Sequence, residues 1–186
     1  NGDGTFSDVS QKSGIAAHPG KGLGVAFADF NNDGFLDITV ANDSFQQSLF
    51  LNNGNGTFRE NALAAGSGFT DEGKVFAGMG TDAADVDDDG KPDIVTTALS
   101  NEMYAYFRNM GDTVFEYNTN VSRLGKFTRL LGGWGMRIFD YDNDGHKDLV
   151  FANSHGMDNI EKMQPQLEYL QRLLLWKQVN GACGDV

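Results

Sequence analysis

The sequence predicts an all-β fold made of repeated four-stranded antiparallel sheets, and three observations support this prediction. A nine-residue loop rich in aspartate occurs three times, beginning at Asp29, Asp85 and Asp140, which lie 56 and 55 residues apart. Apolar and β-branched segments flank each loop, as expected for the central strands of a small sheet. Glycine-rich turns separate further segments of strand length within each repeat. Four short strands per unit, repeated at this period, describe the blades of a β-propeller.

The first two strands of each predicted blade lie on either side of the aspartate loop. A Gly-x-Gly pair precedes the first strand, and its second glycine stands five residues before the first aspartate in every repeat. The first strands are expected at residues 25–28, 81–84 and 136–139. The second strands follow the loops and are expected at residues 38–42, 94–98 and 149–153.

A third strand, and a glycine-rich turn into a fourth, complete each predicted blade. The third strands are expected at residues 48–52, 103–108 and 173–177. The fourth strands carry aromatic residues at Phe58 and Phe115, and the opening segment that ends at Phe6 matches the same turn. In the last repeat Cys183 replaces the aromatic residue, which leaves the pairing of that fourth strand open.

A longer segment separates the second and third strands of the last blade. Its apolar residues recur at helical spacing, and Pro165 interrupts the run, which comprises Ile160, Met163, Leu167, Leu170 and Leu174. We expect a short helical insertion near residues 157–172, with its apolar face packed on the blade. A helix that binds a partner is the alternative.

The repeats predict a single partial β-propeller domain over residues 1–186. Its repeats are expected approximately at residues 7–58, 59–115 and 116–186. Three blades and the edge of a fourth are too few to close a ring around a central axis. We therefore expect a piece of a larger propeller, or copies that associate through open propeller edges; the first interpretation is favoured.

Composition and charge exclude several classes of protein. The formal net charge of -12 leaves no basic stripe for nucleic acid, and no apolar run is long enough to span a membrane. Eleven of the 26 acidic residues stand at predicted ligand positions of the three loops. The acidity is therefore better explained by metal binding than by an acidic surface for a basic partner.

The loops predict up to three calcium sites. Positions 1, 3, 5 and 9 offer side-chain oxygens, position 7 offers a backbone carbonyl, and the glycine at position 6 permits the sharp turn between them. Oxygen ligands suit calcium and give a softer metal no advantage. The predicted ligands are Asp29, Asn31, Asp33, Phe35 and Asp37, then Asp85, Asp87, Asp89, Lys91 and Asp93, then Asp140, Asp142, Asp144, His146 and Asp148.

The loops are not EF-hands, although the two patterns begin alike. An EF-hand requires a glutamate at position 12 and helices on both sides. Position 12 is occupied by Val40, Thr96 and Phe151, each within a predicted apolar strand. Ordinary strand-to-strand turns rich in Asp, Asn and Gly are the remaining alternative, and the threefold repetition of every ligand position argues against it.

The first loop is predicted to bind calcium more weakly than the other two. Asn31 is neutral, so this loop has one carboxylate fewer at its ligand positions. A site-resolved calcium titration checks this order, and equal affinity at all three loops would contradict it.

The loops, the Gly-x-Gly strands before them and the Leu/Ile-Val-rich strands after them resemble FG-GAP/VCBS repeats, the blades of integrin-type calcium-loop β-propellers. The segment from Asn153 to Ile160, with the Gln- and Leu-rich stretch after it, is similar to the ASPIC/UnbV (cartilage acidic protein-like) subgroup. The resemblance covers essentially the whole chain. It implies a propeller of about seven blades, an extracellular or periplasmic (secreted) location, and calcium as a structural ion. It also implies a C-terminal ASPIC segment, which this sequence does not include.

The leading functional hypothesis is a non-catalytic calcium-binding module of a secreted or cell-surface protein. The family uses the loops on its propeller faces to contact protein or glycan ligands, as in cell adhesion. The first alternative is a polysaccharide-active enzyme, a lyase or hydrolase, on a calcium-bearing propeller scaffold. A purely structural spacer is the second alternative.

A search for catalytic or cofactor-binding residues yields none. The three histidines, at positions 18, 146 and 155, have no paired metal spacing, and Cys183 lies in no nucleophile motif. The side chain of His146 is expected to face solvent. Asp82, Glu102 and Asp158 lie outside the loops and could act as acids or bases, but they are expected to be surface charges. Four aromatic residues could stack on sugar rings, although core or blade packing is the expected role of Trp134; they are Trp134, Tyr104, Tyr106 and Tyr141.

Overall fold

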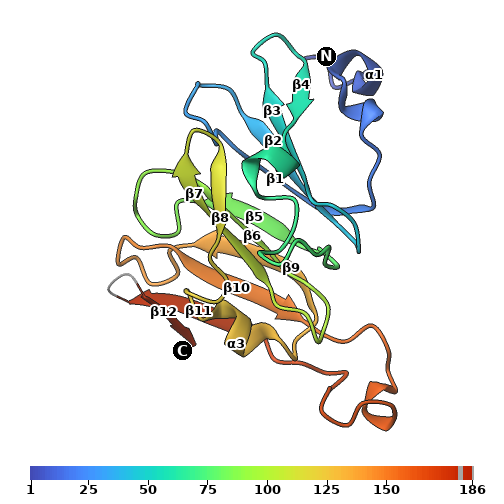
Figure 1. The fold of residues 1–186 in the computed structure, drawn as a ribbon, viewed down its shortest axis with the longest axis vertical. Coiled ribbons are helices and arrows are strands. Elements are labelled where there is room, and N and C mark those ends of the chain that lie inside the picture. Colours follow the sequence, from blue (N-terminus) through green and yellow to red (C-terminus); the bar gives the residue numbers. More distant parts are fainter. Residues whose placement is uncertain (180–181, 186) are drawn as a thin grey trace.

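The computed structural model describes residues 1–179 and 182–185 and contains three four-stranded antiparallel sheets that follow one another along the chain (Figure 1). In each sheet the strands lie side by side in sequence order, so each sheet is one meander. The predicted all-β fold of partial propeller blades is therefore confirmed. The first sheet comprises β1 (Gly22–Ala28), β2 (Asp37–Asn42), β3 (Ser48–Asn52) and β4 (Phe58–Glu60).

The second and third sheets repeat this order. The second comprises β5 (Thr81–Ala84), β6 (Asp93–Thr96), β7 (Ala105–Gly111) and β8 (Val114–Tyr117). The third comprises β9 (Gly133–Phe139), β10 (Asp148–Asn153), β11 (Leu174–Val179) and β12 (Ala182–Asp185). β12 pairs with β11 and places Cys183 opposite Gln178, so the fourth strand pairs despite the missing aromatic residue.

The helices of the described residues are short; two precede the first strand and the others lie in connections between strands. They are α1 (Ser10–Ser13), η1 (Ile15–Ala17), α2 (Ala62–Ala65), α3 (Leu124–Thr128) and η2 (Ile160–Lys162). In the part of the chain that the structure describes, no helix has the length and apolar character needed to cross a membrane.

The predicted insertion near residues 157–172 is present, but only its first turn is helical. Pro165 lacks an amide hydrogen and disfavours helical geometry in the residue before it, which explains why η2 does not continue. Ile160 and Leu167 are buried, whereas Met163 and Leu170 are 63% and 80% exposed. Helical spacing was therefore misleading here, because only part of the expected apolar face is packed.

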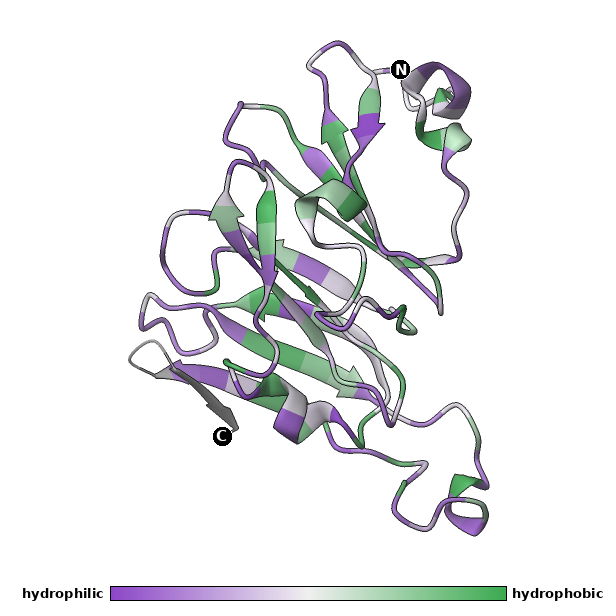
Figure 2. Cartoon of the chain, in the orientation of Figure 1, coloured by the Kyte–Doolittle hydropathy of each residue, from purple (hydrophilic) through white to green (hydrophobic). Residues whose placement is uncertain are grey.

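The hydrophobic core lies in and between the sheets. Figure 2 shows hydrophobic residues along the central strands and hydrophilic residues along most of the loops. The largest fully buried side chains come mainly from the second and third sheets, and include Tyr104, Phe107, Phe151 and Trp176. A continuous core across repeats is expected, because one small sheet cannot bury both of its faces alone.

Among the first strands, β5 packs against both β1 and β9, and the Gly-x-Gly pairs explain how closely these strands approach. A Cβ atom on Gly24 would lie 2.5 Å from the carbonyl oxygen of Met79 in the next repeat. A Cβ atom on Gly80 would lie 2.4 Å from the carbonyl oxygen of Trp134. The second glycine of the pair is therefore required where the backbone of the next blade makes contact.

Replacing Gly80 with alanine is expected to destabilise the fold by about 2–3 kcal/mol, because the added methyl group meets backbone that cannot move aside. The matched control is Gly135→Ala, since a Cβ atom there would meet only the Ala152 side chain at 4.0 Å. Denaturant unfolding of both variants measures the difference. Equal losses of stability would contradict the proposed role of the close backbone approach.

Asp82 links the second blade to the third, and its expected role as a surface charge is wrong. It lies on β5 and is only 9% exposed. Its carboxylate accepts hydrogen bonds from the amide of Ile138 at 2.9 Å and from the Arg137 guanidinium at 3.3 Å, both on β9. The sequence does not reveal this role, because the partners lie about one repeat away along the chain.

Candidate metal centre

The three aspartate loops, residues 29–37, 85–93 and 140–148, have the same backbone conformation. Each joins the first strand of its blade to the second. The residue at position 4 is left-handed in all three, with φ values of 57°, 60° and 60° at Asn32, Asp88 and Asn143. The glycine at position 6 is also left-handed, with φ values of 89°, 87° and 96°. Asn and Asp tolerate this region and glycine prefers it, so the loop sequence specifies the loop geometry.

The aspartate at position 1 organises each loop through backbone amides. In the second loop the Asp85 carboxylate accepts hydrogen bonds from the amides of Asp89 at 3.0 Å and Gly90 at 2.8 Å. Asp29 and Asp140 accept the same pair of bonds in their own loops, at distances of 2.8–3.1 Å. These bonds fix the carboxylates in orientation, and the remaining lone pairs stay available for a cation.

The aspartate at position 9 ties the loop to the third strand. Asp37, Asp93 and Asp148 are each fully buried. In every repeat one carboxylate oxygen accepts the amide of position 2 and the other accepts an amide of the third strand. Burial raises the pKa of Asp93 to about 7, although these hydrogen bonds act to lower it. Burial also raises the pKa of Asp37.

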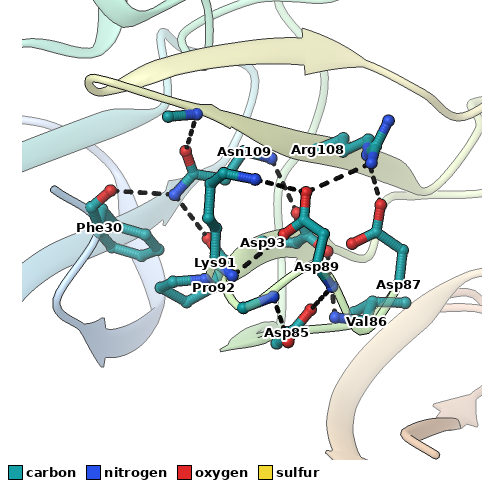
Figure 3. A network of polar contacts seen from close by, with 12 residues as sticks. Phe30, Asp85, Val86, Asp87, Asp89, Lys91, Pro92, Asp93, Arg108 and Asn109 are labelled. Carbon is teal, nitrogen blue, oxygen red and sulfur yellow. Dashed lines mark hydrogen bonds and ion pairs between the residues drawn. The ribbon is translucent and has the colours of Figure 1, made fainter. Parts of the chain in front are cut away.

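Figure 3 shows how the second loop is joined to its surroundings. Asp93 accepts hydrogen bonds from Val86 N at 3.1 Å, Asn109 N at 2.7 Å and the Tyr106 hydroxyl at 3.1 Å. The Asn109 amide group also donates to the carbonyl oxygen of Phe30 in the first loop, at 3.0 Å. The second blade thus helps to hold the loop of the first.

The structure brings together carboxylates at predicted ligand positions in two of the loops. Carboxylate oxygens lie within 4.8 Å of one another in one group of Asp85, Asp87 and Asp89, and in another of Asp140, Asp142 and Asp148. In the first loop the Asn31 amide group donates to the Asp33 carboxylate at 2.8 Å instead. Metal ligation by all fifteen predicted residues, including the backbone carbonyls of Phe35, Lys91 and His146, remains a prediction.

The donor set of the second loop fits a calcium ion. Asp87 Oδ1 is buried and has no hydrogen-bond partner among the described residues. Burying an unpaired carboxylate oxygen costs free energy unless a cation or a hydrogen-bond donor contacts it. The neighbouring side chains at ligand positions also offer carboxylate oxygens, which suit a hard cation. If bound, calcium would draw together carboxylates that otherwise repel one another.

Basic side chains of the third strand also reach the carboxylate clusters, and sequence analysis missed them. Arg108 on β7 forms ion pairs with Asp87 and Asp89. Lys177 on β11 forms ion pairs with Asp142 and Asp144, and hydrogen bonds to both carboxylates raise its pKa. A basic residue directly after a large aromatic residue of the third strand was the available signal.

His146 makes a contact that the sequence did not suggest. Its ring is about half exposed, but Nδ1 lies 2.6 Å from a carboxylate oxygen of Asp88 in the second loop. The hydrogen bond to Asp88 and its charge raise the pKa of His146. Gln178 also donates to Asp88, at 3.1 Å. The second and third loops are therefore linked directly, rather than separated by solvent.

The other candidate residues divide between core and surface. Tyr104 and Tyr106 are buried, so the sugar-stacking role considered for them is wrong. Trp134 is 45% exposed, so its predicted core role is wrong; its indole nitrogen donates to the carbonyl oxygen of Ser154 at 3.1 Å. Tyr141 is 38% exposed.

The two remaining acidic candidates differ in their surroundings. Glu102 is half-buried and accepts the Ala77 amide at 2.8 Å, and burial raises its pKa. It is therefore a structural hydrogen-bond acceptor rather than the free surface charge that was expected. Asp158 is exposed, in agreement with the prediction.

Comparison with known proteins agrees with the geometry of the loops and sheets. A family model described as an FG-GAP-like repeat matches residues 1–40, 33–96 and 85–151. The chain is 31% identical over 164 residues to cartilage acidic protein 1 of Xenopus tropicalis and 30% identical over 166 residues to that of Homo sapiens. Each match covers 84% of this chain and 24% of the relative, so the chain spans about a quarter of their length. The predicted resemblance to this subgroup is confirmed.

Proposed function

This chain belongs to the FG-GAP-like repeat family, and we propose that it is a non-catalytic, calcium-binding β-propeller module of a secreted or cell-surface protein. One observation carries the calcium proposal: the same loop geometry occurs three times, with oxygen donors at every ligand position. The buried, unpaired Asp87 Oδ1 supports it independently. Calcium stabilises the module by binding the folded loops and not the unfolded chain.

The proposed binding role is to present loops to a protein or glycan ligand outside the cell. Similarity to cartilage acidic protein 1, a name that denotes no enzyme activity, supports a non-catalytic module. Half-exposed Trp134 and Tyr141 offer aromatic faces of the kind that stack on sugar rings. Self-association through open propeller edges is a further part of this proposal.

Calcium binding is tested by nuclear magnetic resonance on the labelled chain. Gly34, Gly90 and Gly145 each donate an amide hydrogen bond to the first aspartate of their loop, so each amide signal reports on one site. Calcium is expected to shift all three signals, and excess chelator to reverse the shifts. Magnesium at the same concentration serves as the control for a general ionic effect. Three signals unchanged by calcium would refute the proposed metal role.

The ligand class is tested separately with the calcium-loaded chain. Binding to a glycan array, weakened by Trp134→Ala, would support glycan recognition through this exposed ring. Protein capture without glycan binding would support the protein alternative. Depolymerisation of acidic polysaccharides, measured by the release of new chain ends, would instead favour the enzyme hypothesis and contradict a non-catalytic module.

A further inference from the structure

Two of the three blades carry a basic residue at the same structural position, and the first blade does not. The register of the sheets places Phe50, Phe107 and Trp176 opposite the residue that follows each loop. The next residue of the third strand is therefore equivalent in all three blades. It is Leu51 in the first blade, Arg108 in the second and Lys177 in the third.

Each of these two cations bridges the predicted calcium ligands at positions 3 and 5 of its own loop. The Arg108 guanidinium pairs with Asp87 and also approaches Asp89 at 3.3 Å (Figure 3). The Lys177 ammonium pairs with Asp142 and approaches Asp144 at 3.0 Å. Both side chains are mostly shielded from solvent, with exposures of 35% and 19%. In contrast, Leu51 is buried in the core and brings no charge to the first loop.

Two consequences follow from this position. Without metal, the cation offsets the repulsion between clustered carboxylates and so stabilises the loop. With metal, the same cation opposes calcium, because a positive charge that is only partly exposed to water repels a divalent ion at close range. Calcium must therefore either displace the basic side chain or bind beside it. Either outcome lowers the calcium affinity of the loop.

We propose that Arg108 and Lys177 are built-in counter-cations that hold the second and third loops together without metal and lower their calcium affinity. This inference rests on the proposed calcium-binding function. The loops then differ in more than their number of carboxylates. The extra carboxylate of the second loop is offset by Arg108, and Lys91 adds an ion pair with Asp89 at 2.7 Å. Counting carboxylates alone predicts that the first loop has the lowest calcium affinity. With the counter-cations included, we instead expect the second loop to bind calcium no more tightly than the first.

The test compares Arg108→Leu, which installs the residue of the first blade, with Arg108→Lys, which keeps the charge. Lys12→Leu is the control for net charge, since Lys12 is exposed on α1 and makes no ion pair among the described residues. The calcium affinity of the second loop is read from the Gly90 amide signal. The unfolding midpoint is measured for each variant in excess chelator and in saturating calcium.

Arg108→Leu is expected to tighten calcium binding at Gly90 about tenfold, while the Gly34 signal titrates as in the unmodified chain. In chelator its unfolding midpoint is expected to fall by about 5 °C, and calcium should remove most of that deficit. Lys177→Leu is expected to act in the same way on the Gly145 signal. Arg108→Lys and Lys12→Leu are expected to leave the Gly90 affinity nearly unchanged.

Unchanged calcium affinity in Arg108→Leu, with equal losses of stability in chelator and in calcium, would overturn this inference and leave calcium binding intact. Arg108 would then be a purely structural ion-pair partner. Weaker calcium binding in this variant would also overturn it. A failure of the unmodified chain to respond to calcium is a distinct result, which overturns the proposed function and this inference together.

Discussion

Saturating calcium is expected to raise the thermal unfolding midpoint of this chain by about 20 °C over its value in excess chelator. A ligand present at one hundred times its dissociation constant stabilises a folded protein by about 2.7 kcal/mol for each site, so three sites contribute about 8 kcal/mol. For a domain of this size each kcal/mol raises the midpoint by about 2–4 °C. The expected effect is large because the three loops connect the first and second strands of all three sheets.

The measurement is a thermal scan followed by circular dichroism, in chelator, in calcium and in magnesium. Magnesium is expected to give a much smaller rise, because it requires strict octahedral geometry and loses its bound water reluctantly. A midpoint that is the same in calcium and in chelator would identify the loops as ordinary turns. An equal rise with both metals would indicate ionic screening rather than a calcium site.

Asp93→Ala is expected to destabilise the metal-free chain by about 3–6 kcal/mol, because each buried donor left without an acceptor costs about 1–3 kcal/mol. The lost carboxylate accepts the amides of Val86 and Asn109 and the hydroxyl of Tyr106. These groups come from the loop and from the third strand, so the substitution disconnects the two. Denaturant unfolding in excess chelator measures the effect without any contribution from bound metal.

Two further variants make the Asp93 prediction specific. Asp93→Asn keeps the size of the side chain but replaces one acceptor oxygen with a donor, so an intermediate loss of stability is expected. Asp158→Ala removes a carboxyl group from an exposed position and is expected to change stability little. A loss of less than about 1 kcal/mol for Asp93→Ala would show that position 9 does not tie the loop to the strand.

The sequence predicted those features that depend on residues close together along the chain. The alternation of strands and turns gave the order of four strands in each blade, because each strand is defined by a few adjacent side chains. The same holds for the aspartate loops, in which the residue types at positions 4 and 6 match the left-handed backbone found there. The Gly-x-Gly pairs were also visible in the sequence as a pattern, but the close approach between blades that requires the second glycine was not.

The features that sequence reasoning missed depend on contacts with residues about one repeat away, or on how much of a side chain is exposed to solvent. Asp82 is buried because β9 of the next blade covers it, and His146 contacts Asp88 because two loops lie side by side. Trp134 lies between glycines in a strand and nevertheless remains half exposed. The insertion has helical spacing, but Pro165 and an incomplete apolar contact leave it with only one helical turn.

The fold class, the three blades within this chain and the candidate metal ligands could therefore be predicted from the sequence, since each follows from local spacing and chemistry. The charges that those ligands meet became visible only once the strands were packed together. Arg108 and Lys177 reach the carboxylate clusters from the third strand, which pairs with the second strand of the same sheet. The physical reason is that packing between strands sets electrostatic contacts, and linear spacing carries little information about them.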